Sequence, residues 1–436
     1  MERTVMAQMS TWKQNPKRKP LILSGARQVG KTWLLREFGH KEYDRVIYLN
    51  MDESSIAKNI FDLDLNPQRI IRDLAVFSGG EPIHADNTLI IIDEIQQAPR
   101  ALTSLKYFAE NTPEYHVACA GSLLGVASHP NTSFPVGMVN VLEVHPLTFT
   151  EFLEAYGQGH LAEIIRNAEL PALVPFHDDL VSTLKWYMFL GGMPEAVSVF
   201  LDNHNIAAVR EVCRELLFAY DRDVSKHAPF SEVPRIRAIF NSIPRQLAQE
   251  NRRFVYGNAQ AGARAKTLEL ALQWLLDAGT VHKVQRVQTP RIPLATYTDI
   301  SAFRLFGVDV GLIGTLADLD PSAIINRDAL FTEFKGALTE QYVLQSLVAA
   351  GLNPYYWVSK SGGAEVDFLL QGKAGVIPLE AKAGVNLQAK SLRVFHSTYS
   401  PPVCLRTSLL PFRDEGWVVN IPLYAVDCLG TYIEQI

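Results

Sequence analysis

Eight consecutive residues near the N-terminus have the types and spacing of a phosphate-binding loop. They match the pattern G-x-x-x-x-G-K-[ST] in full: Gly25, Ala26, Arg27, Gln28, Val29, Gly30, Lys31 and Thr32. The glycines let backbone N–H groups turn toward a bound anion, and a helix that begins here adds partial positive charge. The Lys31 ammonium can reach the β- and γ-phosphates, and the Thr32 hydroxyl can ligate Mg²⁺. The segment predicts an ATP site with a magnesium ion.

Two acidic residues follow a later apolar run. Asp93 and Glu94 come directly after Leu89–Ile92, which has the composition of a buried strand. An acid at the carboxyl end of such a strand can hold Mg²⁺, directly or through water, and the next acid can polarise the attacking water. Asp93 alone would serve a protein that only binds nucleotide, whereas Glu94 implies that the nucleotide is hydrolysed.

Ser122 follows another apolar run, 116–120. Its hydroxyl could contact the γ-phosphate or the attacking water. A hydroxyl that caps a turn explains the same local sequence equally well.

A second group of reactive side chains lies near the C-terminus. Polar and apolar residues alternate at Glu365–Phe368 and again at 380–382, which is typical of strands. Pairing these strands across the turn 371–375 would bring Asp367, Glu380 and Lys382 to one face. Two carboxylates can bind Mg²⁺ beside a scissile phosphate, and the lysine can orient or activate water.

Glu340, on a helix predicted over 332–350, could supply another ligand to this cluster. The arrangement has the PD-(D/E)xK nuclease pattern, with Val366 in place of the nominal proline. The alternative is an inactive protein that keeps the fold, in which Glu380 and Lys382 form a surface ion pair.

The segments around the phosphate-binding loop are predicted to form a parallel α/β sheet. Four short apolar runs alternate with helical segments over the first 145 residues, as expected for strands covered on both faces: 21–23, 46–49, 89–92 and 116–120. From Pro146 to about Tyr220 the pattern turns mainly helical.

Residues 226–300 form a basic module. Two predicted helices, 234–250 and 267–278, precede an extended segment at 281–287, which is the outline of a winged helix. The module contains 11 Lys and Arg against 5 Asp and Glu. Arg264 and Lys266 near the second helix could grip nucleic-acid phosphates in a salt-dependent way, flanked by Arg252, Arg253, Lys283 and Arg286. A solvated basic face, or packing against the acidic remainder, is the alternative.

Composition sets limits on the class of protein. The 436 residues are 47% hydrophobic and 20% charged with a formal net charge of −5, which excludes a globally basic nucleic-acid coat. The four cysteines form no C-x-x-C pair, and this favours a reducing cytoplasm over a disulfide framework or a cysteine zinc site. We expect no membrane partner, because the chain has no signal-peptide pattern and no apolar run of about 18 residues.

These motifs resemble the AAA+ superfamily of ATPases, with Gly25–Thr32 as Walker A, Leu89–Glu94 as Walker B and Ser122 as sensor 1. The segments 93–96, 146–152 and 190–195 narrow the resemblance to a bacterial and archaeal family. In that family an AAA+ ATPase precedes a C-terminal domain with a restriction-endonuclease-like core. Many of its members have an arginine where Met138 follows Gly137 in this chain. The resemblance therefore leaves the arginine finger unassigned or supplied from elsewhere, for example by Arg222 or by another subunit.

The combined expectation is an α/β protein with four parts. These are a P-loop AAA+ ATPase core at 1–145, a helical region at 146–225, a winged-helix-like module at 226–315 and a restriction-endonuclease-like domain at 316–436. The resemblance implies ATP hydrolysis with Mg²⁺, coupled to DNA or RNA through the C-terminal domain, with possible self-association into rings. A nucleotide-gated switch that binds protein and does not cut is the alternative.

Overall fold

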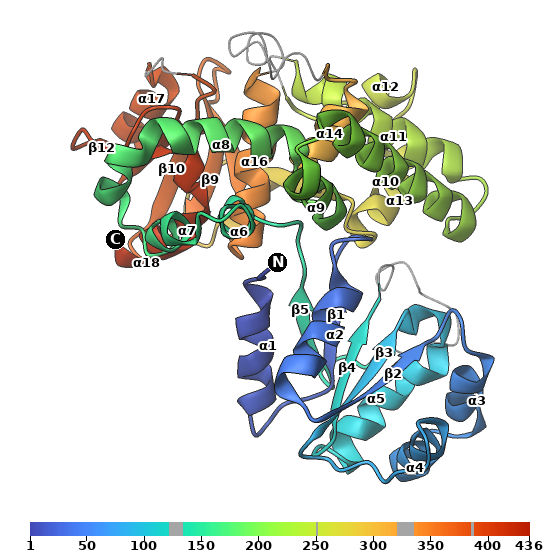
Figure 1. The fold of residues 1–436 in the computed structure, drawn as a ribbon. Coiled ribbons are helices and arrows are strands. Elements are labelled where there is room, and N and C mark those ends of the chain that lie inside the picture. Colours follow the sequence, from blue (N-terminus) through green and yellow to red (C-terminus); the bar gives the residue numbers. More distant parts are fainter. Residues whose placement is uncertain (122–133, 250–251, 321–334, 385–387) are drawn as a thin grey trace. The chain divides into compact units, whose positions relative to one another are not determined.

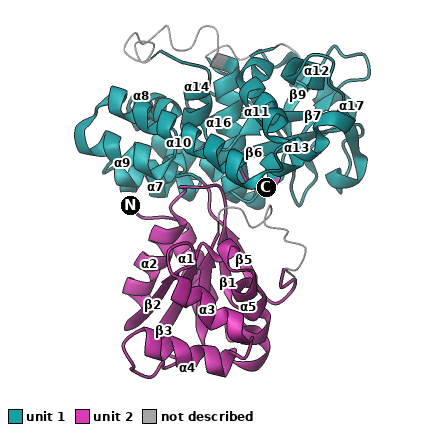
Figure 2. Cartoon of the chain, turned by 90° about the vertical axis from the view of Figure 1, so that its right-hand side faces the viewer, with its two compact units in different colours: residues 1, 146–276, 280–436 teal, residues 2–145, 277–279 magenta. Residues whose placement is uncertain are grey.

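The computed structural model describes residues 1–121, 134–249, 252–320, 335–384 and 388–436. Ser122, the expected sensor, lies outside these residues. The chain divides into two compact units (Figure 2). The N-terminal unit comprises residues 2–145 and 277–279, and the C-terminal unit comprises residue 1, 146–276 and 280–436. No helix in the described part of the chain is both long and apolar enough to cross a membrane.

The N-terminal unit is built on a five-stranded sheet with the order β2-β3-β4-β1-β5 (Figure 1). Every neighbouring pair is parallel. The strands are β1 (Leu21–Ser24), β2 (Arg45–Asn50), β3 (Thr88–Asp93), β4 (His116–Ala120) and β5 (Asn140–Glu143). All residues of β3 and β4 are buried, which explains their unbroken apolar composition. The predicted parallel α/β sheet is confirmed.

Helices connect these strands and cover the sheet. They are α1 (Val5–Gln14), α2 (Lys31–Glu42), α3 (Ser55–Leu63), α4 (Pro67–Phe77) and α5 (Pro99–Asn111), with a short 3-10 turn η1 (Ile95–Gln97) after β3. Buried side chains of α3, α4 and α5 pack with those of β2, β3 and β4 in one apolar cluster. Ile22 of β1, the strand that leads into the phosphate-binding loop, belongs to the same cluster.

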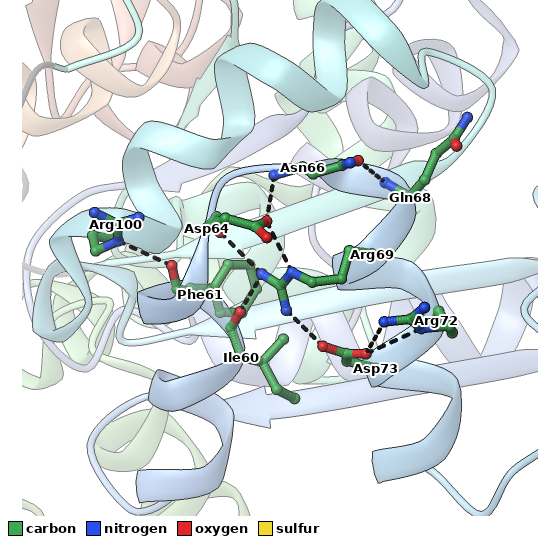
Figure 3. A network of polar contacts seen from close by, with 9 residues as sticks. All are labelled: Ile60, Phe61, Asp64, Asn66, Gln68, Arg69, Arg72, Asp73 and Arg100. Carbon is green, nitrogen blue, oxygen red and sulfur yellow. Dashed lines mark hydrogen bonds and ion pairs between the residues drawn. The ribbon is translucent and has the colours of Figure 1, made fainter.

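The α3–α4 connection is held by the side chain of Arg69 (Figure 3). Its guanidinium donates to the Asp64 carboxylate at 2.8 Å, to the Asp73 carboxylate at 2.6 Å and to the Ile60 carbonyl at 2.7 Å. Asn66 caps α4 by accepting a hydrogen bond from the Gln68 N–H. These local contacts satisfy polar groups at the ends of both helices, which explains how a polar turn follows α3 without breaking the packing of the unit.

The C-terminal unit begins with a helical region. Its elements are α6 (Phe149–Ala155), α7 (Gly159–Arg166), η2 (Leu170–Phe176), α8 (His177–Leu190), α9 (Pro194–Asn203), α10 (Ile206–His227), α11 (Val233–Leu247), α12 (Tyr256–Ala259) and α13 (Ala265–Asp277). Thr148 and Glu151 form a reciprocal capping box at the start of α6. α11 and α13 correspond to the two helices predicted for the basic module.

An eight-stranded sheet, ordered β12-β13-β11-β10-β9-β8-β6-β7, organises the rest of this unit. Its strands are β6 (Val281–Val287), β7 (Thr298–Gly307), β8 (Tyr355–Val358), β9 (Glu365–Gln371), β10 (Val376–Ala381), β11 (Cys404–Ser408), β12 (Arg413–Asp414) and β13 (Val418–Pro422). The remaining helical elements are η3 (Leu294–Tyr297), α14 (Val310–Leu316), α16 (Lys335–Ala349), α17 (Lys390–Tyr399), η4 (Leu423–Cys428) and α18 (Leu429–Gln435).

The β6–β7 hairpin, expected as the wing of a separate module, is part of this larger sheet. β6 pairs with β7 on one side and with β8 on the other, through Arg286 and Val287. Val281, Val284 and Val287 of β6 are buried. The hairpin is therefore continuous with the C-terminal strands, and residues 226–276 and 280–436 belong to one compact unit.

Two glycines hold the helical region against the end of β7. The Gly192 N–H donates to the buried Asp309 carboxylate at 2.6 Å, and Leu147 N–H donates to the Gly192 carbonyl at 2.7 Å. A Cβ atom at Gly191 would lie 2.1 Å from the Asp309 side chain, and one at Gly192 would lie 2.0 Å from the Leu147 carbonyl oxygen. The glycines thus permit a close approach of three chain segments that a larger residue would prevent.

Candidate functional site

The phosphate-binding loop lies between β1 and α2, as predicted. Gly25 has φ 141° and Gly30 has φ 95°, both in the region that favours glycine. A Cβ atom at Gly25 would lie 2.2 Å from the Val144 carbonyl oxygen, so only glycine fits beside the strand end. α2 begins directly after Gly30, and its N-terminal N–H groups are available to an anion at this loop.

The Lys31 ammonium is buried against the loop. It donates to the carbonyl oxygens of Gly25 at 2.9 Å and Ala26 at 2.7 Å. Burial lowers its pKa to about 8, while the charges of Glu94 and Asp93 oppose this shift. The loop therefore carries a cation that is poorly solvated and ready to exchange carbonyl contacts for phosphate oxygens.

Asp93 and Thr32 meet across the sheet. The Thr32 hydroxyl donates to Asp93 Oδ2 at 2.8 Å, although β4 separates the strands β1 and β3 that lead to these two residues. Hard divalent cations prefer oxygen ligands, and here a hydroxyl and a carboxylate oxygen adjoin at the N-terminus of α2. The two side chains that were predicted to hold the metal are brought together.

Glu94 lies next to this pair with a backbone φ of 52°, which is unusual for a residue other than glycine. Its N–H donates to Asp93 Oδ1 at 3.0 Å, and its own carboxylate accepts from the Gln96 side chain at 2.5 Å. This left-handed residue directly follows the end of β3 at Asp93. Gln96 is an orienting partner that the sequence did not reveal.

Two further residues of this site were missed from the sequence. The Tyr48 hydroxyl donates to Asp93 Oδ2 at 2.7 Å. The buried Arg3 guanidinium donates to the carbonyl oxygens of Val29 at 3.0 Å and His145 at 2.6 Å, and so ties the loop to the segment after β5. The hydroxyl of Tyr48 is a polar group within the apolar run 46–49, and this could have indicated a role for Tyr48 in the site. No local sequence pattern indicates such a role for Arg3.

Arg222, one position considered for an arginine finger, lies on α10 of the C-terminal unit. Its guanidinium is 5.7 Å from the centre of the Phe218 ring.

The carboxylate cluster of the C-terminal unit has a different organisation from the predicted one. Arg252 forms ion pairs with Glu340 of α16 and, at 3.3 Å, with Asp367 of β9. The buried Arg304 of β7 lies 3.4 Å from Glu340 and 3.9 Å from Asp367, and it also pairs with Glu365. Burial and the nearby Asp367 charge raise the pKa of Glu340, against the effect of the two arginines.

Glu380 pairs with Lys382 at 2.5 Å in the same region. The regular β9–β10 ladder ends at Phe368 and Leu379, and Asp367 Oδ2 instead accepts from the Ala381 N–H at 3.0 Å. β9 also carries an extra residue opposite β8, so strict alternation is broken around Asp367. Burial raises the pKa of Glu380, while Lys382 opposes the shift.

The predicted ligands Glu340, Asp367 and Glu380 thus share one neighbourhood, but arginines hold the first two. Among the residues that the structure describes, no three His, Cys, Asp or Glu side chains are grouped so that they could hold a metal ion. The expected ion pair of Glu380 with Lys382 is present, with Glu380 buried rather than at the surface.

Comparison with known families divides the chain into three segments. Residues 17–153 match the family described as an AAA domain, whose core is the loop and sheet described above. The N-terminal unit thus contains the segment that matches an AAA domain, with a P-loop between its first strand and the following helix. Residues 181–323 and 335–424 match two domains of unknown function, DUF8612 and DUF4143.

An uncharacterized protein of Methanocaldococcus jannaschii is 25% identical to this chain over 200 residues. The match covers 42% of this chain and spans only 40% of the relative's length.

The solved structures to which the chain is similar include a Walker-type ATPase of Pyrococcus abyssi, at 15% identity and a TM-score of 0.45. That match covers 72% of this chain and 95% of the other. Cdc6p of Pyrobaculum aerophilum is 14% identical with a TM-score of 0.26, covering 74% of this chain and 93% of its own.

Proposed function

We propose that this protein hydrolyses ATP at the loop between β1 and α2 and couples turnover to nucleic-acid binding by its C-terminal unit. The observation that carries the hydrolytic site is the meeting of Thr32 with Asp93, beside Lys31. Thr32 and Asp93 would hold Mg²⁺, directly or through water, and Lys31 would bind the β- and γ-phosphates. Bound there, Mg²⁺ would neutralise charge on the transferred phosphoryl group.

Glu94 is proposed as the residue that polarises the attacking water. Glu94→Gln should leave ATP bound but slow hydrolysis roughly 10²- to 10⁴-fold, because the amide cannot accept the proton. Single-turnover hydrolysis and ATP affinity, measured on the same preparations, separate the two effects. Glu37→Gln is a matched control, since Glu37 is on α2 in an ion pair with Lys41. Unchanged hydrolysis by Glu94→Gln would show that another residue polarises the attacking water, and Ser122 is the next candidate for that role.

The nucleic-acid partner is proposed from the basic module. Arg264 and Lys266 are exposed at the start of α13, and the exposed Leu270 lies one turn further along the helix. The four expected flanking residues contribute less than predicted. Arg286 pairs with Asp299, Arg253 donates to the Ser301 carbonyl, and Lys283 lies over the Phe303 ring. Arg252 is held by the carboxylate cluster, so the proposed phosphate contacts centre on α13.

The test is ATP turnover with and without DNA or RNA at several salt concentrations. We expect nucleic acid to stimulate turnover and the effect to weaken steeply with salt. The salt dependence is measured as the slope of the logarithm of the binding constant against the logarithm of the salt concentration. The double variant Arg264→Ala, Lys266→Ala should reduce the magnitude of this slope by about 2. Lys106→Ala on α5 should leave the slope unchanged. Absence of binding and stimulation would instead favour a nucleotide-gated switch that acts on protein partners. Sedimentation with ATP would test whether a second copy completes the site.

A binding role is favoured over cutting for the C-terminal domain, because Arg252 and Arg304 neutralise Glu340 and Asp367. The succession of α16, β8, β9 and β10 supports the proposed restriction-endonuclease-like core. We therefore expect no cleavage of DNA or RNA with Mg²⁺ or Mn²⁺. Cleavage that Asp367→Ala or Lys382→Ala abolishes, with ATP turnover intact, would show that this domain is a nuclease.

We also propose a cytoplasmic location. All four cysteines are buried and unpaired, as expected in a reducing compartment.

A further inference from the structure

Asp93 accepts three hydrogen bonds from within the N-terminal unit. Oδ2 accepts from the Thr32 hydroxyl at 2.8 Å and from the Tyr48 hydroxyl at 2.7 Å, while Oδ1 accepts from the Glu94 N–H at 3.0 Å. A carboxylate offers about two acceptor directions on each oxygen. Both directions of Oδ2, the oxygen beside Thr32, are therefore used by protein donors.

The register of the sheet explains why Tyr48 reaches Asp93. Tyr48 on β2 lies opposite Ile91 on β3, and Asp93 follows Ile91 by two residues. Because side chains alternate with a period of two, Tyr48 and Asp93 project from the same face of neighbouring strands. The contact is a diagonal pair, built by the sheet itself rather than by a loop.

The helix that carries the phosphate-binding residues also holds the Tyr48 ring. Arg36 on α2 lies with its guanidinium 3.9 Å from the centre of that ring. Thr32 and Arg36 are four residues apart on α2, and so they share one face of the helix. One face of α2 thus carries both Thr32, the proposed metal ligand, and Arg36, whose guanidinium packs on the Tyr48 ring.

We propose that Tyr48 is a positioning residue of the ATP site, whose hydroxyl fixes the Asp93 carboxylate beside Thr32 and sets the affinity of the site for Mg²⁺. Since Oδ2 already accepts from two protein donors and Oδ1 from one, Asp93 would act on the metal through Oδ1, directly or through a water. This inference rests on the proposed Mg²⁺-dependent hydrolysis. Groups that orient metal ligands typically contribute 10- to 100-fold to metal affinity or activity.

Tyr48→Phe removes only the hydroxyl and keeps the ring beneath Arg36. Tyr43→Phe is the matched control, because Tyr43 is in the same unit, also lies under a cation, Lys13 at 4.4 Å, and hydrogen-bonds His116 at 2.6 Å. It precedes β2, at the opposite edge of the sheet from the loop. Any general effect of losing a tyrosine hydroxyl in this unit should appear in both variants.

The experiment measures binding of a non-hydrolysable ATP analogue by calorimetry, with EDTA and over a titration of Mg²⁺. For Tyr48→Phe we expect the Mg²⁺ concentration at half-effect to rise about tenfold or more, with metal-free affinity within twofold of wild type. Tyr43→Phe should change neither quantity. The Mg²⁺ dependence of ATP turnover should shift in parallel.

A shift of less than threefold in Tyr48→Phe would overturn the proposal. An equal loss of metal-free and Mg²⁺-dependent affinity would also overturn it, because Tyr48 would then support the loop as a whole. If Mg²⁺ has no effect on the wild-type protein, the proposed function itself fails, which distinguishes the two results.

Discussion

At the scale of single residues, the ATP site depends on charges held in a poorly solvated place. Lys31 is buried on loop carbonyls, and Asp93 is buried among hydroxyl donors. Neither side chain could be kept there by apolar packing alone, because burying an unpaired charge is costly. Each is instead compensated by several polar contacts, and nucleotide with its metal would replace some of them.

Lys31 predicts how ATP affinity depends on pH. Burial lowers its pKa to about 8 in the free protein, but ATP binds the charged form. When the pH is raised through 8, Lys31 therefore loses its proton in the free protein. ATP binding above this pH requires Lys31 to take up a proton. We expect the Kd for ATP to be flat below about pH 7 and to rise toward tenfold per pH unit above 9. Calorimetry across this range tests it.

Lys41→Ala, at an exposed position of α2, should keep the same profile. Lys31→Ala should abolish tight binding at every pH. Wild-type affinity in that variant would contradict the assignment of the loop.

At the scale of elements, glycines decide where segments approach closely. Gly191 and Gly192 let the end of α8 meet Leu147 and Asp309, three segments far apart in sequence. Burial raises the pKa of Asp309 to about 6, against the hydrogen bonds from backbone N–H groups such as that of Gly192. The conspicuous segment 190–195 is thus explained as packing within the C-terminal unit.

Gly192→Ala should lower the free energy of unfolding by at least about 2 kcal/mol, because its Cβ would meet the Leu147 backbone and not a flexible side chain. Denaturant unfolding followed by circular dichroism measures the change. Gly257→Ala on α12 is the control, since nothing lies within 4 Å of its Cβ position. Equal stabilities of the two variants would mean that the backbone relaxes around position 192.

At the scale of the whole molecule, the ATP site belongs to the N-terminal unit and the eight-stranded sheet to the C-terminal unit (Figure 2). Each unit has its own apolar core, so that unfolding need not be a single transition.

We expect two transitions in scanning calorimetry, of which nucleotide raises one. A ligand at 100 times its Kd stabilises the unit that binds it by about 2.7 kcal/mol. Lys31→Ala should remove the shift and leave the other transition in place. One transition that moves as a whole with nucleotide would show that the two units unfold together.

The local sequence determined the chemistry of the ATP site and the class of its sheet. Gly25–Thr32 and Asp93-Glu94 are contiguous runs, whose backbone conformation and neighbouring apolar strands follow from nearby residues. The Thr32–Asp93 contact followed as well, because carboxyl ends of parallel strands meet at one edge. Only the tertiary structure showed that Tyr48 and Arg3 support this site, since sheet register and long-range packing bring them there. It also decided that Arg252 and Arg304 hold the C-terminal carboxylates, and that β6 joins β8. These contacts join segments tens of residues or more apart, and pairing at that distance depends on the global packing of the unit rather than on any local pattern.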